Sequence, residues 1–209
     1  ALVKIAYGIA ETADTEAKSE AMYQEGLVFE ESGRFSDALA SFESVFRDFP
    51  GQPAAPYARM GWARAQSRLG LPEKALEGYD AVFRQYPRYG ATALAAIGDI
   101  REVQGRPGEA AFVMRVILRD FPMSPEAKAA RERLVPLCGA VVALPVTATV
   151  WGDVLGRGEC LLDAGKFEDA TNEYVWLWKN MTQKEPAMVG VRGSYMANDM
   201  QRLAAAHKP

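Results

Sequence analysis

The residues that most often carry chemistry in enzymes are scarce in this sequence of 209 residues. It has one histidine, His207, and two cysteines, Cys138 and Cys160. A metal centre made of His and Cys side chains, or a catalytic triad with a histidine inside the chain, needs more of these residues than the sequence holds. We therefore predict that the protein has no catalytic residue, no metal site and no bound cofactor.

Two other patterns could carry chemistry, and neither meets its requirements. Residues 190–195 (GVRGSY) have glycines three apart, but no lysine follows them as a phosphate-binding loop requires. Neighbouring acids such as Glu30 and Glu31 occur where helix faces are expected, and such acids are normally solvated. A formal net charge of −3 argues against nucleic-acid binding through bulk charge. These exclusions favour a protein that binds other proteins.

The two cysteines and a charge-free stretch at residues 134–152 bear on disulfides and membranes. Two cysteines do not make a disulfide framework, and we expect both to be buried as small apolar side chains, with a single bridge as the alternative. The charge-free stretch is long enough to span a membrane, but Pro136 and Pro145 would interrupt its helix. We predict a buried linker there, with a short strand near 146–151, and keep a membrane span as the alternative.

Three segments of the chain repeat one pattern of glycine, alanine and proline. The repeated residues are Gly33, Gly70 and Gly105, then Ala38, Ala75 and Ala110, then Pro50, Pro87 and Pro122. Both intervals within the pattern are the same in all three copies, which predicts a repeated helical hairpin. Glycine ends the first helix in the left-handed conformation, and proline ends the second. Since one hairpin cannot bury its apolar face alone, neighbouring hairpins must stack.

The spacing of apolar residues locates both helices of each hairpin. The second helices carry apolar stripes, which are Ala38, Phe42, Val45 and Phe46 in the first copy and Ala75, Tyr79, Val82 and Phe83 in the second. The first helices are expected at residues 16–32, 56–69 and 91–104. The chain is therefore predicted to be all-α.

This pattern resembles the tetratricopeptide repeat family over residues 18–134. The signature of that family, an alanine, an aromatic four residues later and a proline, is matched by Ala38, Phe42 and Pro50 and again in the second copy, while the third copy has Met114 at the aromatic position. The resemblance implies a right-handed superhelical solenoid of antiparallel helix pairs. Residues 121–134 (FPMSPEAKAARERL) are most similar to repeats of bacterial envelope proteins such as the Tol–Pal coordinator and the outer-membrane-assembly lipoprotein.

The sequence divides into four predicted parts. These are an N-terminal extension at 1–15, three repeats with a covering helix at 16–134, an apolar linker at 135–150, and a diverged fourth hairpin with a final helix at 151–209. Ser124 is the expected N-cap of the covering helix, because serine accepts from free backbone N–H groups. The fourth hairpin is inferred from Gly158, Gly165, Ala170 and Tyr174, which fall on the repeat template.

The first helices of such solenoids line the concave face, which usually binds the partner. Matching positions predict a partner-binding groove made of Tyr23, Leu27, Glu30, Tyr57, Met60, Arg64, Arg68, Asp99 and Glu102. Arg64 and Arg68 are one turn apart and could hold a carboxylate, and the alternative is that Arg64 pairs with Asp99 or Glu102. The carboxylate clamp of the chaperone-binding branch is missing, since Tyr23, Leu27 and Gly61 occupy its positions. We expect an extended or helical peptide instead.

A second candidate surface is aromatic and follows residue 150. It contains Trp151, Trp176, Trp178 and Tyr195. Trp176 and Trp178 are two positions apart, so on a helix they cannot share one face and one of them is expected to be exposed or at an interface. Packing of both tryptophans in a small core is the first interpretation, and a docking patch is the other, since aromatic side chains are enriched at protein interfaces.

The predicted function is a non-catalytic scaffold or adaptor for a protein or peptide partner, with no nucleic acid and no metal. The alternative is a permanently bound accessory subunit of a larger bacterial complex. A self-assembling stack of repeats is a further possibility. The resemblance to envelope proteins favours the periplasm over the cytoplasm.

Overall fold

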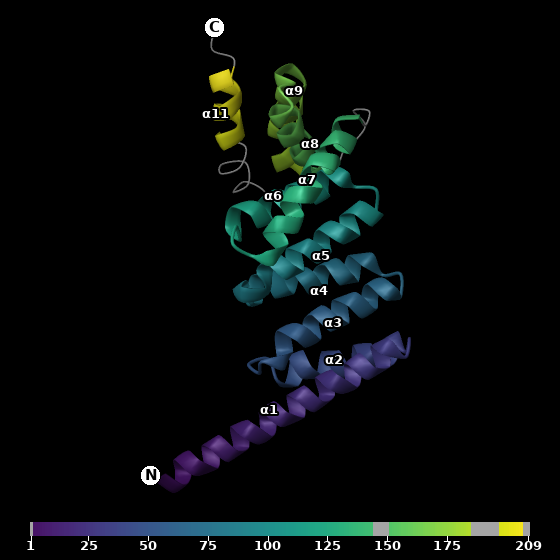
Figure 1. Cartoon of the computed structure of the whole chain (residues 1–209), viewed down its shortest axis with the longest axis vertical. Helices are drawn as coiled ribbons and strands as arrows, with labels where there is room; N and C mark the ends of the chain where they lie inside the picture. Colours follow the sequence, from purple (N-terminus) through teal and green to yellow (C-terminus); the bar gives the residue numbers. More distant parts are fainter. Residues whose placement is uncertain (1, 144–150, 185–196, 207–209) are drawn as a thin grey trace. The chain divides into compact units, whose positions relative to one another are not determined.

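Helices make up nearly all of this protein, whose structure is a computed structural model (Figure 1). It describes residues 2–143, 151–184 and 197–206, and no strand occurs among them. The helices are α1 (Leu2–Glu31), α2 (Phe35–Asp48), α3 (Ala54–Arg68), α4 (Pro72–Gln85), the 3-10 helix η1 (Pro87–Tyr89), α5 (Gly90–Val103), α6 (Pro107–Asp120), α7 (Pro125–Ala143), α8 (Trp151–Asp163), α9 (Phe167–Lys184) and α11 (Ala197–Ala206). The predicted all-α architecture is confirmed.

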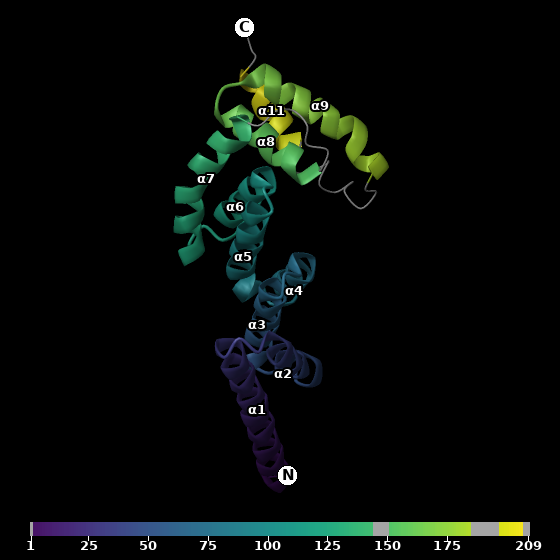
Figure 2. The same cartoon turned by 90° about the vertical axis from the view of Figure 1, so that its right-hand side faces the viewer.

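The helices pack into two compact units, which we describe separately. The first unit is Ala1–Ala96 and the second is Ile97–Pro209. Within the first unit, α1 and α3 lie on one side and α2 and α4 on the other (Figure 2). This is the layering of stacked antiparallel hairpins that the repeat predicts.

Glycine turns join the two helices of each hairpin, as predicted. Gly33, Gly70 and Gly105 have φ values of 73°, 75° and 69°, which is the left-handed region that only glycine adopts at low cost. In the first turn the N–H of Arg34 donates to the carbonyl of Phe29 at 2.9 Å, and the N–H of Gly33 donates to Glu30 at 3.0 Å. Both bonds satisfy carbonyl groups that the end of a helix leaves without a partner.

The second helices bury most of the predicted stripes, with Phe46 and Phe83 half-buried, and end just before the predicted prolines. Helices α2, α4 and α6 stop at Asp48, Gln85 and Asp120, each two residues before a proline. The buried side chains at matching positions are Ala38, Phe42 and Val45, then Ala75, Tyr79 and Val82, then Ala110, Met114 and Ile117. Met114 therefore fills the place that an aromatic ring takes in the other two copies.

The core of the first unit is organised around Phe42. A Cβ added to Gly26 of α1 would lie 2.5 Å from this ring, and a Cβ added to Gly61 of α3 would lie 2.7 Å from it. Only glycine permits so close an approach of both first helices to one ring. The Phe42 ring of α2 thus packs between α1 and α3 and holds the first hairpin against the second.

The second unit has a core of its own, built by helices α8, α9 and α11. Its buried apolar residues, which we call the second core, are Val154, Leu155, Leu161, Leu162, Ala170, Tyr174, Leu177 and Leu203. Helices α6 and α8 also meet backbone to backbone, because a Cβ added to Gly156 would overlap the carbonyl group of Gly108. Gly165, with φ 71°, joins α8 to α9 in the same way as the three predicted turns.

The start of α1 corrects the N-terminal boundary predicted from the sequence. Residues 1–15 were expected to be an extension, whereas α1 is helical from Leu2 to Glu31. No proline interrupts this stretch, and most of its residues are good helix formers. The apolar periodicity that marks the repeat therefore begins later than the helix itself.

The end of α7 corrects the predicted linker at 135–150. The N–H of Ala127 donates to Ser124 Oγ at 3.2 Å, as expected for an N-cap, but the helix then continues through Pro136 to Ala143. Proline removes one backbone hydrogen bond and does not end the helix here, because Leu137 and Val141 beyond it are buried. The predicted strand at 146–151 lies mostly outside the described residues, and Trp151 begins α8.

The two cysteines form a disulfide, which overturns the prediction that both are buried as free thiols. Cys138 of α7 and Cys160 of α8 are joined, with their Cα atoms 5.1 Å apart. Sequence separation alone does not show that two helices bring such residues together.

No helix of the described residues combines the length and the apolar content needed to cross a bilayer.

Candidate partner-binding surface

Three tyrosines from successive hairpins of the first unit lie in series, and we call them the tyrosine row. Tyr23 comes from α1, Tyr57 from α3 and Tyr89 from η1. The ring centroids of Tyr23 and Tyr57 are 6.1 Å apart, and those of Tyr57 and Tyr89 are 5.1 Å apart. Tyr57 in the middle is 42% exposed. Stacking of the hairpins therefore brings one tyrosine from each of three hairpins into a continuous strip of rings.

A hydrogen bond and burial act on the hydroxyl groups of the tyrosine row. Tyr89 donates its hydroxyl proton to the hydroxyl oxygen of Tyr57 at 3.1 Å, and this bond raises the pKa of Tyr89. Burial raises the pKa of Tyr23, and the nearby Arg64 opposes that change. Since the Tyr57 hydroxyl accepts from Tyr89, its own proton is directed elsewhere. The row thus combines apolar ring surface with a hydrogen-bond donor.

An ion pair beside the tyrosine row joins the first two hairpins. Arg64 Nε lies 2.5 Å from Glu30 Oε1, and Arg64 Nη2 lies 2.5 Å from Glu30 Oε2. Hydrogen bonding to Glu30 raises the pKa of Arg64. Arg64 therefore pairs with a neighbouring acid, as the alternative interpretation held, but this acid is Glu30 of the preceding hairpin, which reaches the guanidinium in two-point geometry.

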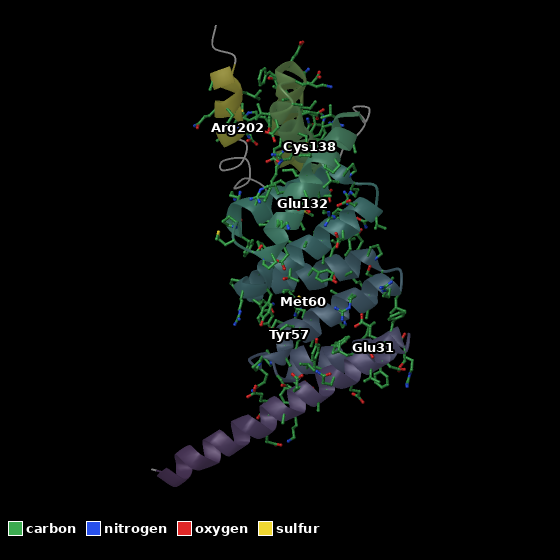
Figure 3. The ribbon with its side chains drawn as sticks, viewed as in Figure 1. Glu31, Tyr57, Met60, Glu132, Cys138 and Arg202 are labelled. Atoms are coloured by element: carbon green, nitrogen blue, oxygen red, sulfur yellow. A yellow bond between two sulfur atoms is a disulfide. The ribbon has the colours of Figure 1, made fainter. Side chains whose placement is uncertain are left out.

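Three other residues of the predicted groove belong to the first unit. Leu27 is half-buried and packs against the core around Phe42, so its main role is structural. Met60 is half-buried on the same helix as Tyr57 (Figure 3). Arg68 is exposed at the end of α3 and forms no ion pair among the described residues.

The two acids of the predicted groove, Asp99 and Glu102, lie in the second unit. Arg133 of the covering helix α7 holds both, with its Nη2 atom 2.7 Å from Asp99 Oδ1 and in contact with Glu102 Oε1. One cation therefore faces two carboxylates, and Asp99 stays largely exposed. This end of α5 keeps an excess of negative charge.

The repeats that build this surface match the model of a known protein family. The family model described as a tetratricopeptide repeat matches the sequence twice, at residues 23–89 and 60–125. Residues 23–125 belong to the tetratricopeptide repeat family. Proteins of this family generally bind other proteins.

Solved structures similar to this chain share little sequence with it. One is a tetratricopeptide repeat protein from Parabacteroides merdae, which is 15% identical, with a TM-score of 0.47 over 91% of this chain and 77% of the other. Another is a putative kinesin light chain from Podosopora anserina with nearly identical TPR-like repeats, which is 11% identical, with a TM-score of 0.44 over 81% of this chain and 98% of the other. No curated protein matches the sequence.

The predicted aromatic patch of this repeat protein is described in part. Trp176 is half-buried and packs against the second core, whereas Trp178 is 45% exposed, as their spacing on a helix requires. Val175 is also exposed and lies three positions before Trp178, so the two are neighbours on the surface of α9. The side chain of Trp151 and the whole of Tyr195 lie outside the described residues.

A charged network in the second unit escaped the sequence analysis. Arg115 of α6 contacts two acids of α8, with Nε 3.2 Å from Glu159 Oε2 and Nη1 2.7 Å from Asp163 Oδ2. Arg202 of α11 also binds Asp163 at 2.8 Å and contacts Asp199 at 3.3 Å. The network thus links three helices. No group of acids, histidines and cysteines suited to a metal ion occurs among the described residues.

Tyr89 and Arg133 are the surface residues that the sequence analysis missed. Tyr89 lies two residues after Pro87 and outside the predicted first helix, so helical periodicity does not indicate it. Its distance of 32 positions from Tyr57 is close to one repeat and is the signal that could have found it. Arg133 belongs to the covering helix, for which the repeat offers no matching position.

Proposed function

We propose that this chain is a non-catalytic scaffold or adaptor that binds a protein or peptide partner through the first helices of its repeats. The tyrosine row carries the proposal. A strip of tyrosine rings offers large contact area with few rotatable bonds, so little conformational entropy is lost on binding. Tyrosine is also one of the residue types enriched among the anchors of protein interfaces.

The residues around the tyrosine row support an extended peptide as the partner. Met60 adds an adaptable apolar side chain next to Tyr57, and Arg68 adds a positive charge one turn beyond Arg64. The pair of Glu30 with Arg64 holds α1 against α3 and keeps the rings in register. In the second unit, Asp99 and Glu102 would by themselves attract positive charge on a partner, since Arg133 balances only one of them.

The test compares two single variants of the full chain after its partner has been captured and identified. Tyr57→Ala removes the central ring of the row, and Leu71→Ala removes an apolar side chain of equal exposure, 42%, at the turn between α3 and α4. We expect Tyr57→Ala to weaken binding about tenfold or more, as loss of an interface anchor does, and Leu71→Ala to leave the Kd unchanged. Equal Kd values for both variants would contradict the proposal.

The full chain is needed for this test, because the structure shows that dividing it at residue 134 would damage the second unit. Helix α7 runs from Pro125 to Ala143, so the division would cut it in the middle. It would also separate Arg115 of α6 from the two cysteines whose sulfur atoms it contacts. Single substitutions avoid both problems.

A permanently bound accessory subunit is the second candidate function, and α9 supports it. Val175 and Trp178 form an exposed apolar pair on α9 that a permanent partner would cover. Trp178→Ala, with Val28→Ala on α1 as the control, separates the two candidates. Loss of co-purification with Trp178→Ala and not with Tyr57→Ala would favour the accessory subunit over the adaptor.

We also propose an oxidising compartment, with the bacterial periplasm as the leading choice. The disulfide between Cys138 and Cys160 supports it, since such bonds persist mainly outside the reducing cytosol. The similarity of residues 121–134 to envelope repeat proteins points the same way and extends the proposal to that subtype. Fractionation of the cells that produce the protein tests it, and recovery with cytosolic markers would contradict it.

A further inference from the structure

The positively charged side chain of Arg115 contacts the disulfide of the second unit. Arg115 Nη2 is 3.4 Å from Cys138 Sγ and 3.7 Å from Cys160 Sγ, so the guanidinium of α6 contacts both sulfur atoms. Cys160 is buried, whereas Cys138 is half-buried. A nearby arginine stabilises a thiolate and therefore favours its formation when a disulfide opens.

The acids around Arg115 leave part of its charge uncompensated. Burial raises the pKa of Glu159 to about 8, and the opposing effect of Arg115 does not cancel it. The carboxyl of Glu159 is therefore mostly protonated near neutral pH. Asp163 is shared between Arg115 and Arg202. A cysteine thiolate at this place would supply the guanidinium with a further negative partner.

The disulfide also holds a segment of helix that follows a weak point. Pro136 lies inside α7 and cannot donate the backbone hydrogen bond of its turn. Just beyond it, Leu137 and Val141 are buried, and Val142 packs against the second core. Cys138 ties this end of α7 covalently to α8. Apolar contacts and the disulfide thus attach the last turns of α7, directly after the position where Pro136 removes a backbone hydrogen bond of the helix.

We propose that the Cys138–Cys160 disulfide is a redox-controlled latch, which Arg115 makes easy to open, and that reduction releases the end of α7 beyond Pro136 from the second core. A dithiol reductant supplies the electrons. Its first thiolate attacks Cys138 Sγ, the S–S bond breaks, and Cys160 leaves as a thiolate beside Arg115. The second thiol of the reductant then attacks the mixed disulfide at the reductant's own sulfur. Cys138 leaves, the reductant becomes a disulfide, and its two protons pass to the solvent or the two cysteines.

Release of the end of α7 would change the surface of the second unit. Leu137 and Val141 would become exposed, and Val142 would leave the second core, whose surface beneath it would become accessible. The proposal does not depend on partner binding through the tyrosine row, because all its residues lie in the second unit.

Amide hydrogen exchange of the full chain tests the release. Exchange is compared before and after reduction with dithiothreitol, and in the double variant Cys138→Ser with Cys160→Ser, which needs no reductant. We expect residues 137–143 to exchange about tenfold faster in both cases, while α8 and the first part of α7 keep their protection. Unchanged exchange at 137–143 would overturn the latch. Equally faster exchange over the whole second unit would also overturn it, since that result means general destabilisation.

The role of Arg115 is tested by the balance between oxidised and reduced protein in a buffer of oxidised and reduced dithiothreitol. Arg115→Met removes the cation from the sulfurs, and Arg119→Met, one turn along α6 and paired with Asp120, removes the same charge elsewhere. We expect Arg115→Met to shift the balance about tenfold toward the disulfide, Arg119→Met to have no effect, and Arg115→Lys to restore part of the balance. If Arg115 only supports the packing, its loss will make reduction easier, and that opposite sign would overturn the proposal.

Discussion

The guanidinium of Arg64 binds the carboxylate of Glu30 at two points, with both N–O distances at 2.5 Å, across two successive repeats. Glu30 belongs to α1 and is mostly buried in this contact, whereas Arg64 of α3 is partly exposed. The pair lies beside Tyr23, whose ring contacts Tyr57. It therefore connects the hairpin interface to the surface that we propose as the binding site.

Removal of this ion pair should loosen the first two repeats. Glu30→Gln and Arg64→Gln, alone and together, form a double-mutant cycle, and we expect a coupling of about 1 kcal/mol at low salt that decreases at high salt. Urea unfolding of each variant measures it. The more exposed pair of Arg47 with Asp48 is the control and should show no measurable coupling. A coupling for Glu30 and Arg64 that matches the control would show that the pair does not join the repeats.

The contact between α6 and α8 should tolerate no side chain at residue 156. A Cβ on Gly156 would overlap the backbone of Gly108, which cannot move without displacing the whole helix. We expect Gly156→Ala to lower the free energy of unfolding by about 3 kcal/mol.

Gly139→Ala is the matched control for this change. Gly139 is also helical, and nothing lies within 4 Å of the Cβ that alanine would add there. This variant should be more stable than the wild type by about 0.5–1 kcal/mol, because alanine favours the helix. Thermal unfolding of both variants measures the difference, and equal stability of the two would contradict the close contact between α6 and α8.

The buried carboxyl of Glu159 should make stability depend on pH. Its pKa is about 8 in the folded chain and close to its ordinary value when unfolded, so between about pH 4.5 and 8 the folded state binds more protons. The contribution of Glu159 to the free energy of unfolding is therefore most favourable at low pH. It decreases as the pH rises through this range, with a slope of at most about 1.4 kcal/mol per pH unit.

Comparison with Glu159→Gln isolates this dependence from that of other groups. Burial also raises the pKa of Asp199, while Arg115 and Arg202 oppose both changes, so the wild type alone shows a mixed profile. Urea unfolding from pH 5 to 8 should show the stability of the wild type decreasing relative to the variant. Parallel curves would mean that Glu159 titrates normally.

Local backbone chemistry explains what could be predicted from the sequence. The left-handed turns at Gly33, Gly70 and Gly105 and the cap at Ser124 depend on residues within one or two turns of each other, and they were found from spacing alone. The stripe containing Phe42 was found because burial on one helix face follows the helical period.

Contacts between distant side chains explain what could not be predicted. The reach of Arg64 allows it to bind acids of either neighbouring repeat, and only the packing of α1 against α3 selects Glu30. The disulfide and the continuation of α7 past Pro136 depend on each other, because the bond to Cys160 holds the helix beyond the proline. The sequence around Pro136 and the cysteines therefore predicts neither the disulfide nor the continuation of the helix.

Photo-crosslinking tests the proposed binding surface most directly. A benzophenone-bearing amino acid replaces Tyr57, Leu71 or Trp178 in three versions of the full chain, and each is irradiated with the bound partner. The account predicts a crosslink to the partner from position 57 and none from position 71. Crosslinks from position 178 alone, or from position 71 as strongly as from position 57, would contradict the claim that the tyrosine row binds the partner.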